Sequence, residues 1–364
     1  MRITILWSAL AGYSVAFFRE LALSENCCVQ LIYQKPEVAA PYNEFDLSFC
    51  ENAVEDSPGI RASLEERVAG FSPACILMSG WAHPHFMRIA RRMRGRGIYV
   101  VATMDNQWRG TFKQYIGIVT AHRFLKPAID TFLVAGERQA QFARKLGYEQ
   151  VLHGCYAAEV EKFATRLAVT SRPRAFLFVG RLIPIKNLHG LAEAYRLYRE
   201  RVADPWTLIV VGTGPLASVL TDAEGVEPLG FVQPRLLPNV MWRARCLVLP
   251  SIFEPWGVVI HEAAAAGLPI VASYRCGAVT ALMRDGINGF VVAPSADSIA
   301  DAMIHVAESS DSELRAMSRA SLQLASLWTP TMLARYFYSR ISKRLSRASG
   351  RDVTGEVFRN AKAH

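Results

Sequence analysis

The sequence has no uninterrupted apolar run of about 18 residues, the length that a membrane-spanning helix requires. It also has no low-complexity tract, and its composition of 51% hydrophobic and 20% charged residues is that of a globular protein. The opening MRITILWSAL resembles a secretory signal, but AGYSVAFFREL continues it into an amphipathic pattern. We therefore expect a first strand, a glycine turn and a helix there.

Cysteine is scarce and irregularly placed. The seven cysteines are odd in number and show neither a CxxC motif nor a Cys/His spacing typical of metal sites. This distribution is typical of reduced thiols in a cytoplasmic protein. We expect no metal site.

Signatures of nucleic-acid binding are missing as well: there is no aromatic–basic RNA module, zinc finger or helix-turn-helix, so we expect no nucleic-acid partner. The net charge is nevertheless +9. Two segments concentrate the positive charge, and they are either solvated helix faces or contacts for an anionic membrane surface or a phosphorylated lipid. The first contains Arg88, Arg91, Arg92, Arg94 and Arg96, and the second Arg335, Arg340, Lys343, Arg344, Arg347 and Arg351.

Short apolar runs rich in β-branched residues alternate with helical patterns along the whole chain. Strands that alternate with helices predict parallel, doubly wound sheets, so the fold class is α/β. The runs lie at 3–7, 28–33, 74–78, 98–103, 130–136, 175–180, 207–212, 246–251 and 269–273.

The series of strands pauses once, at the polar and basic segment ATRLAVTSRPR (164–174). We interpret it as a linker between a first domain over 1–165 and a second over 172–328. With 364 residues, two domains of ordinary size are expected. The last amphipathic stretch predicts a helix over about 329–350, which either caps the second domain or, as we favour, packs back on the first. The tail beyond about Gly350 is expected to be weakly ordered.

FVGRLIPIKN (178–187) combines a strand with a glycine and two cations. Open α/β sheets bind ligands at the carboxyl ends of their strands, and Gly180 allows a close backbone approach there. Arg181 can grip two oxygens, while Lys186 supplies a mobile charge, so the pair suits a diphosphate. An ordinary turn with surface charges is the alternative. The spacing of a nucleotide-hydrolysing P-loop is absent.

VVGTGP (210–215) and EPLGFV (227–232) are two further strand ends. The glycine pair at Gly212 is not the full dinucleotide fingerprint and is weak evidence alone. Backbone groups of Phe231 and Val232 could hold a flat base, although a plain turn explains that segment equally well.

FEPWGVVIHEAAAAGLP (253–269) sets two carboxylates into an apolar run. The pattern predicts a helix that begins near Gly257, so Glu254 precedes the helix and Glu262 lies inside it. The free N–H groups of such a helix start favour a phosphate. Four alanines after Glu262 predict a closely packed face, where a solvated surface acid is out of place. We interpret both acids as acceptors for sugar hydroxyls.

Five segments of the second half resemble, in their order along the chain, the nucleotide-sugar half of the retaining family 4 glycosyltransferases of the GT-B fold. They are VGRLIPIKN, IVVGTGP, LGFV, LPSIFEPWGVVIHEAAAAGLPIVAS and DGINGFVV. The two acids match that family's E-x7-E motif. The resemblance covers residues 174–294 closely and the earlier chain only loosely. It implies two Rossmann-like doubly wound domains facing a central cleft.

The resemblance also implies a role for each matching residue. Arg181 and Lys186 hold the donor diphosphate as it leaves, Glu254 contacts hydroxyls of the transferred sugar, and Glu262 contacts the ribose. Arg181, Lys186 and Glu254 are the catalytic candidates, although Glu254 is not expected to be a covalent nucleophile. The other donor-binding positions are Gly12, Gly180, Gly212, Phe231, Val232, Gly257, Val258 and Val259. Two departures are Ala11-Gly12, where the family often has a glycine pair, and the absence of the usual Asn-Gly near the end of the first domain.

The first domain is expected to hold the acceptor on two strand-end loops, SGWAHPHF (79–86) and MDNQWRG (104–110). His83 or Asp105 could assist deprotonation of the incoming hydroxyl, and structural roles are an equal alternative for each. The acceptor-binding candidates are His83, Asp105, Asn106, Trp108 and Arg109.

The sequence therefore predicts a metal-independent hexosyltransferase without a cofactor. Its donor is a nucleotide sugar such as UDP- or GDP-hexose, and its acceptor a glycan or a lipid-linked sugar in polysaccharide or lipopolysaccharide synthesis. Anomeric configuration is expected to be retained, and the location to be the cytoplasm, with peripheral attachment to the inner face of its membrane. The alternatives are a sugar phosphorylase, a sucrose- or trehalose-type synthase, and a non-catalytic subunit that binds a nucleotide sugar.

Overall fold

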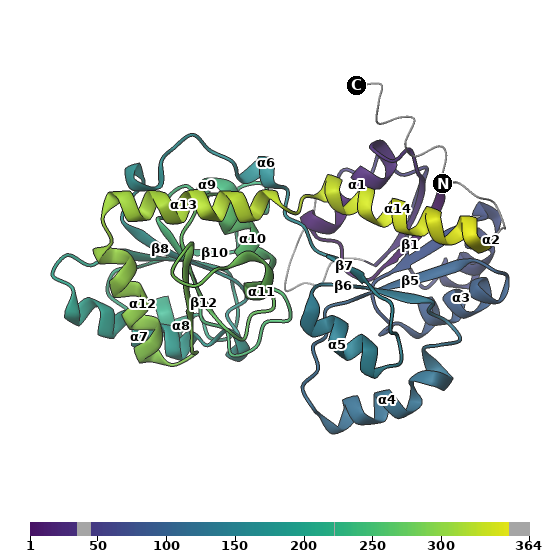
Figure 1. Ribbon diagram of the computed structural model, residues 1–364, viewed down its shortest axis with the longest axis horizontal. Coiled ribbons are helices and arrows are strands. Elements are labelled where there is room, and N and C mark those ends of the chain that lie inside the picture. Colours follow the sequence, from purple (N-terminus) through teal and green to yellow (C-terminus); the bar gives the residue numbers. More distant parts are fainter. Residues whose placement is uncertain (35–44, 222, 349–364) are drawn as a thin grey trace.

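The structure is a computed structural model that describes residues 1–34, 45–221 and 223–348. Two α/β domains lie side by side (Figure 1). Each is built on a parallel sheet, which confirms the doubly wound fold that the alternating pattern predicts. Within these residues, none of the helices combines the length and the hydrophobicity that crossing a bilayer would take.

The first domain contains a seven-stranded sheet in the order β3-β2-β1-β4-β5-β6-β7. Its inner strands are apolar on both faces because helices cover both sides of the sheet. Its elements are β1 (Arg2–Trp7), α1 (Gly12–Leu23), β2 (Cys28–Tyr33), β3 (Asn52–Glu55), α2 (Leu64–Phe71), β4 (Cys75–Met78), α3 (Pro84–Gly95), β5 (Tyr99–Met104), α4 (Phe112–Phe124), β6 (Thr131–Val134), α5 (Glu137–Lys145) and β7 (Leu152–His153).

The second domain follows the short helix α6 (Val160–Phe163) and contains a six-stranded sheet in the order β10-β9-β8-β11-β12-β13. Its elements are β8 (Ala175–Val179), η3 (Pro184–Lys186), α7 (Leu188–Arg201), β9 (Thr207–Val211), α8 (Ser218–Thr221), β10 (Val226–Gly230), α9 (Leu237–Met241), β11 (Cys246–Leu249), α10 (Val258–Ala265), β12 (Ile270–Ser273), α11 (Val279–Leu282), β13 (Gly289–Val292), α12 (Ala296–Glu308) and α13 (Asp311–Ser326). β8 pairs in parallel with both β9 and β11, so the loops that follow these three strands meet at one sheet edge.

The chain crosses back to the first domain near Trp328, whose indole N–H donates to the carbonyl of Gly154 at 3.2 Å. The last helix, α14 (Pro330–Ala348), then packs along α1 (Figure 1). Phe337 of α14 meets Phe17 of α1 edge to face, with ring centroids 5.8 Å apart. The second basic segment lies on α14, except for Arg351, which lies with the expected tail outside the described residues.

Candidate active site

Lys186 and Glu254 come together at the carboxyl edge of the second sheet. Lys186 ends η3, after β8, and Glu254 lies in the loop between β11 and α10. The Lys186 ammonium and the Glu254 carboxylate form an ion pair, with only 13% of each side chain exposed. Arg181, in the same loop as Lys186, is exposed and forms no ion pair with a described residue. The edge therefore presents one paired cation and one unpaired cation.

Glycines allow the loops at this edge to pack closely. Gly212 has φ +136°, and a Cβ there would lie 1.9 Å from the carbonyl oxygen of Gly180. A Cβ on Gly214 would lie 2.4 Å from the carbonyl oxygen of Leu182. The GTG sequence thus has a packing explanation, because these glycines hold the loop that carries Arg181 against the end of β9.

The helix expected after Glu254 is α10, and its N-cap is Gly257 with φ +94°. Val258 and Val259 form its first turn and are half-buried, so their backbone N–H groups lie at the helix start. Glu262 lies one turn further along the helix. Burial raises the pKa of Glu262 to about 7, and the nearby carboxylate of Glu159 raises it as well.

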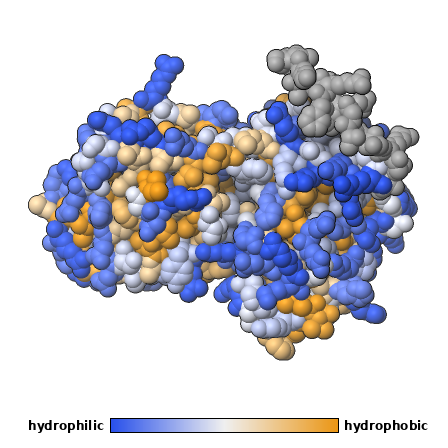
Figure 2. Space-filling view, in the orientation of Figure 1, coloured by the Kyte–Doolittle hydropathy of each residue, from blue (hydrophilic) through white to orange (hydrophobic). Residues whose placement is uncertain are grey.

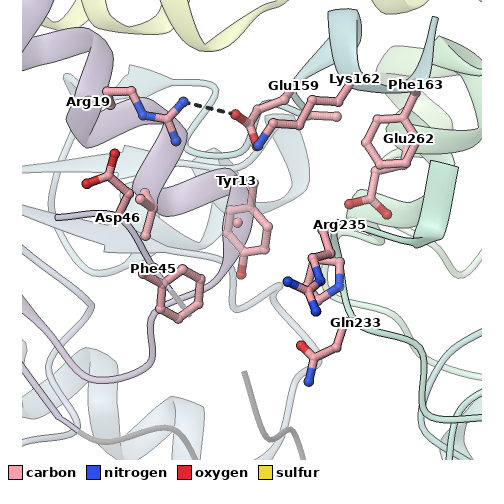
Figure 3. A pocket seen from close by; sticks show the side chains of 14 residues that line it. Tyr13, Arg19, Phe45, Asp46, Glu159, Lys162, Phe163, Gln233, Arg235 and Glu262 are labelled. Carbon is pink, nitrogen blue, oxygen red and sulfur yellow. Dashed lines mark hydrogen bonds and ion pairs between the residues drawn. The ribbon is translucent and has the colours of Figure 1, made fainter. Parts of the chain in front are cut away.

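Glu262 lines a cavity of about 280 Å³ between the domains, together with Gly12 from the first domain (Figure 3). A Cβ on Gly12 would meet no atom within 4 Å, so packing does not require this glycine. The loop that carries Phe231 and Val232 runs to this cavity, since the residues that follow them, Gln233 and Pro234, line it. Lys186 and Glu254 are not among its lining residues.

Sequence reasoning missed the cations of this cavity. Arg19 of α1 and Lys162 of α6 both pair with Glu159, at 3.3 Å and 2.6 Å. Figure 3 shows Arg235 beside Glu262 on the second-domain side. Arg19 and Lys162 lie outside the motifs, and only the packing of the two domains brings them to Glu262.

The loop after β5 approaches the Glu254 loop from the first domain. The guanidinium of Arg109 lies 4.4 Å from the ring centroid of Phe253. Asp105 accepts a hydrogen bond from the hydroxyl of Tyr156 at 3.2 Å, and Asn106 is exposed. Two of the acceptor candidates are therefore held in defined contacts near the boundary of the domains.

Trp108 and His83 have other surroundings. The Trp108 ring packs on Tyr115 and Phe142 of its own domain, with centroids 5.0 Å and 5.7 Å away. His83 is the N-cap of α3 and lies 3.4 Å from the Gln34 amide nitrogen through Nδ1. Burial and the neighbouring His85 lower the pKa of His83, so its imidazole is neutral at pH 7 and able to accept a proton.

Two glutamines that the sequence did not single out join the domains behind Glu254. The Gln107 amide donates to the carbonyls of Glu254 and Pro255, at 3.1 Å and 2.9 Å. The Gln139 amide donates to the carbonyl of Pro255 at 2.7 Å and to that of Asp105 at 3.0 Å. Trp256 packs so closely on Gly136 that a Cβ there would lie 2.7 Å from its ring. The backbone that carries Glu254 is thus held by the first domain.

Residues 173–309 match the sequence model of the family Glycosyl transferases group 1. The matched residues make up most of the second domain. The match spans β8 to α12, so Arg181, Lys186, Glu254 and Glu262 all lie within the matched residues. Among the residues that the structure describes, no three His, Cys, Asp or Glu side chains are grouped so that they could hold a metal ion.

Parts of this chain are similar in sequence to curated proteins. An uncharacterized glycosyltransferase of Methanocaldococcus jannaschii is 34% identical over 38% of this chain and 37% of its own length. A GDP-mannose-dependent alpha-(1-6)-phosphatidylinositol monomannoside mannosyltransferase of Mycobacterium tuberculosis is 27% identical over 62% of this chain and 56% of its own. The alignments thus span about a third to a half of these relatives' length.

The two-domain architecture also matches solved structures over nearly the whole chain. The structure of Anabaena HepE in complex with UDP and glucose superimposes with a TM-score of 0.71 at 16% identity, and covers 94% of this chain and 100% of that one. At that identity the likeness concerns the fold, and it shows that this chain has the GT-B fold that the motifs implied.

Proposed function

We propose that the protein transfers a hexose from a nucleotide-diphosphate sugar to a glycan or lipid-linked acceptor. The observation that carries this proposal is the Lys186–Glu254 pair at the ligand-binding edge of a group 1 glycosyltransferase domain. A cation suited to phosphate and an acid suited to sugar hydroxyls meet where the sugar–phosphate bond of the donor would lie. The mannosyltransferase relative and the UDP complex of HepE agree with a nucleotide-sugar donor.

In the proposed reaction, the bond between the anomeric carbon and the diphosphate oxygen breaks while the acceptor hydroxyl attacks from the same face, so the anomeric configuration is retained. Lys186 and Arg181 stabilise the negative charge that develops on the leaving diphosphate, together with the backbone N–H groups at the start of α10. Glu254 accepts hydrogen bonds from the transferred sugar, and Glu262 from the ribose. This electrostatic stabilisation requires no metal.

We assign the acceptor to the first-domain face of the boundary, near Asp105 and Arg109. The neutral imidazole of His83 and the carboxylate of Asp105 are the two candidates for accepting the proton of the attacking hydroxyl. A lipid-linked acceptor would place the protein at the cytoplasmic face of a membrane, in cell-surface polysaccharide or lipopolysaccharide synthesis.

A donor screen followed by turnover assays tests this proposal. Melting temperature is measured with UDP, GDP, ADP and their sugars, because a ligand that binds only the folded state stabilises it. The donor that binds should then give turnover with a glycan or lipid-linked acceptor extract. Turnover that occurs only with inorganic phosphate would indicate a phosphorylase. Turnover that occurs only with a soluble sugar acceptor would indicate a synthase. Donor binding without turnover in any acceptor mixture would indicate a non-catalytic subunit.

A further inference from the structure

Helix α4 turns an apolar face toward solvent. Phe112 and Val119 are 79% and 81% exposed, and Tyr115 and Ile116 are 56% and 48% exposed. Figure 2 shows an apolar patch at the lower end of the first domain, where Figure 1 places α4. Single exposed apolar residues are common on proteins, but four on one helix form a patch that marks an interaction surface.

The spacing of these residues puts them on one face. Positions 112, 115, 116 and 119 follow the i, i+3, i+4, i+7 pattern of a single helix stripe. The opposite face carries Ala121, the one residue of α4 that is buried. The helix thus packs on its domain through Ala121 and the partly buried Ile118, while the four larger residues of the stripe are displayed outward.

Polar contacts hold α4 in place without covering the stripe. The hydroxyl of Thr111 caps the helix by accepting from the Gln114 backbone N–H at 3.4 Å. The Gln114 side-chain amide donates to the carbonyl of Gln107 at 2.7 Å. At the other end, the guanidinium of Arg91 in α3 donates to the carbonyl of Phe124 at 3.3 Å. The outward apolar face is therefore part of an anchored helix with its own cap.

The segment that carries the stripe has charges of one sign only. The segment from Asn106 to Ile129 contains no aspartate or glutamate, but it contains Arg109, Lys113, Arg123 and Lys126. Lys113 and Arg123 lie on α4 itself, and both are exposed. An apolar stripe bordered by cations and free of acids complements an anionic phospholipid surface, where apolar side chains enter the acyl boundary and cations remain at the phosphates.

We propose that α4 is a docking helix for an anionic bilayer, with Phe112, Tyr115, Ile116 and Val119 inserted at the headgroup–acyl boundary. This proposal rests on the proposed function in one respect: a lipid-linked acceptor would lie in the membrane to which α4 docks. α4 and α14 lie at opposite edges of the first domain (Figure 1). The basic residues of α14 therefore do not belong to the proposed docking surface.

Vesicle co-sedimentation tests the docking surface. The full chain is mixed with vesicles of phosphatidylcholine alone or with phosphatidylglycerol added. We expect the unmodified protein to bind only the anionic vesicles. Two double variants should each bind these vesicles about tenfold or more weakly. They are Phe112→Ser with Val119→Ser, and Lys113→Gln with Arg123→Gln. The matched control is Leu327→Ser with Ile287→Ser, which removes two apolar side chains of 65% and 58% exposure elsewhere and should change nothing.

The same variants separate this proposal from the proposed function. Their melting temperatures and their shifts with the nucleotide sugar should equal those of the unmodified protein, because neither pair belongs to the donor site. Vesicle binding through α4 in a protein that binds no nucleotide sugar would overturn only the proposed function. Absence of binding to anionic vesicles, or full binding by the α4 variants, would overturn the docking helix. So would light scattering that shows a dimer which the α4 variants dissociate, since a second copy would then cover the stripe.

Discussion

The Lys186 ammonium and the Glu254 carboxylate, 68 positions apart in the chain, form an ion pair in which only 13% of each side chain is exposed. Each group is assigned to a different part of the donor, Lys186 to the diphosphate and Glu254 to the sugar. A bound donor would therefore replace one ion pair by two separate interactions. Under this assignment, both charged groups are already in place before the donor binds.

Lys186→Ala should destabilise the fold and also suppress turnover. The substitution leaves a largely buried carboxylate without its cation, which should lower the free energy of unfolding by about 1–3 kcal/mol. Turnover should fall about 100-fold or more, because the charge on the leaving diphosphate loses a stabilising cation. Urea unfolding and initial rates measure the two effects. The matched control is Arg196→Ala, whose ion pairs lie on an exposed helix face and should matter little. Normal rates for Lys186→Ala would contradict its assignment.

Arg181→Ala should separate the two effects. Arg181 is exposed and forms no ion pair with a described residue, so the melting temperature should stay unchanged while turnover falls about 100-fold. Combined with Lys186→Ala, it should abolish turnover. An Arg181→Ala enzyme with full activity would show that this guanidinium does not contact the diphosphate.

Glu262 should make stability depend on pH. Its pKa is raised to about 7 in the folded state, so between its ordinary pKa of 4.5 and 7 the folded protein binds more protons than the unfolded chain. This contribution to stability is therefore lost as pH rises through that window. Glu262→Gln should raise the free energy of unfolding at pH 8 by up to about 3 kcal/mol and change it little at pH 4. Urea titrations at both pH values check this, and a variant equally or less stable at pH 8 would contradict it.

Gln107 should act as a positioning residue for Glu254. Gln107→Leu removes the donor to the carbonyls of Glu254 and Pro255, so the rate at saturating donor should fall about tenfold while donor affinity stays the same. Gln107→Glu gives a sharper test, because a carboxyl donates a hydrogen bond only when protonated. Its rate relative to the unmodified enzyme should therefore rise as pH is lowered. A pH-independent ratio would indicate that Gln107 only fills space.

The fold was readable from the sequence because its inner strands are buried on both faces and appear as continuous apolar runs, such as those of β1 and β8. Two edge strands of the first sheet were not predicted from the sequence. β3 (Asn52–Glu55) is polar and partly exposed, and β7 (Leu152–His153) has only two residues. Neither carries the pattern that a buried strand requires.

The candidate site was readable only where its residues share a motif, and their roles stay predictions. Gln107, Gln139 and Arg19 reach the boundary through the packing of two domains, which local periodicity does not encode. The stripe on α4 has the spacing of any amphipathic helix, and the sequence does not tell which face turns outward.

Calorimetric titration with UDP-, GDP- and ADP-sugars, in buffer containing EDTA, tests the central claim most directly. We expect one nucleotide series to bind, and the protein with both Arg181→Ala and Lys186→Ala to bind it at least about tenfold more weakly. No heat with any of these donors, or equal affinity in the doubly substituted protein, would contradict the account.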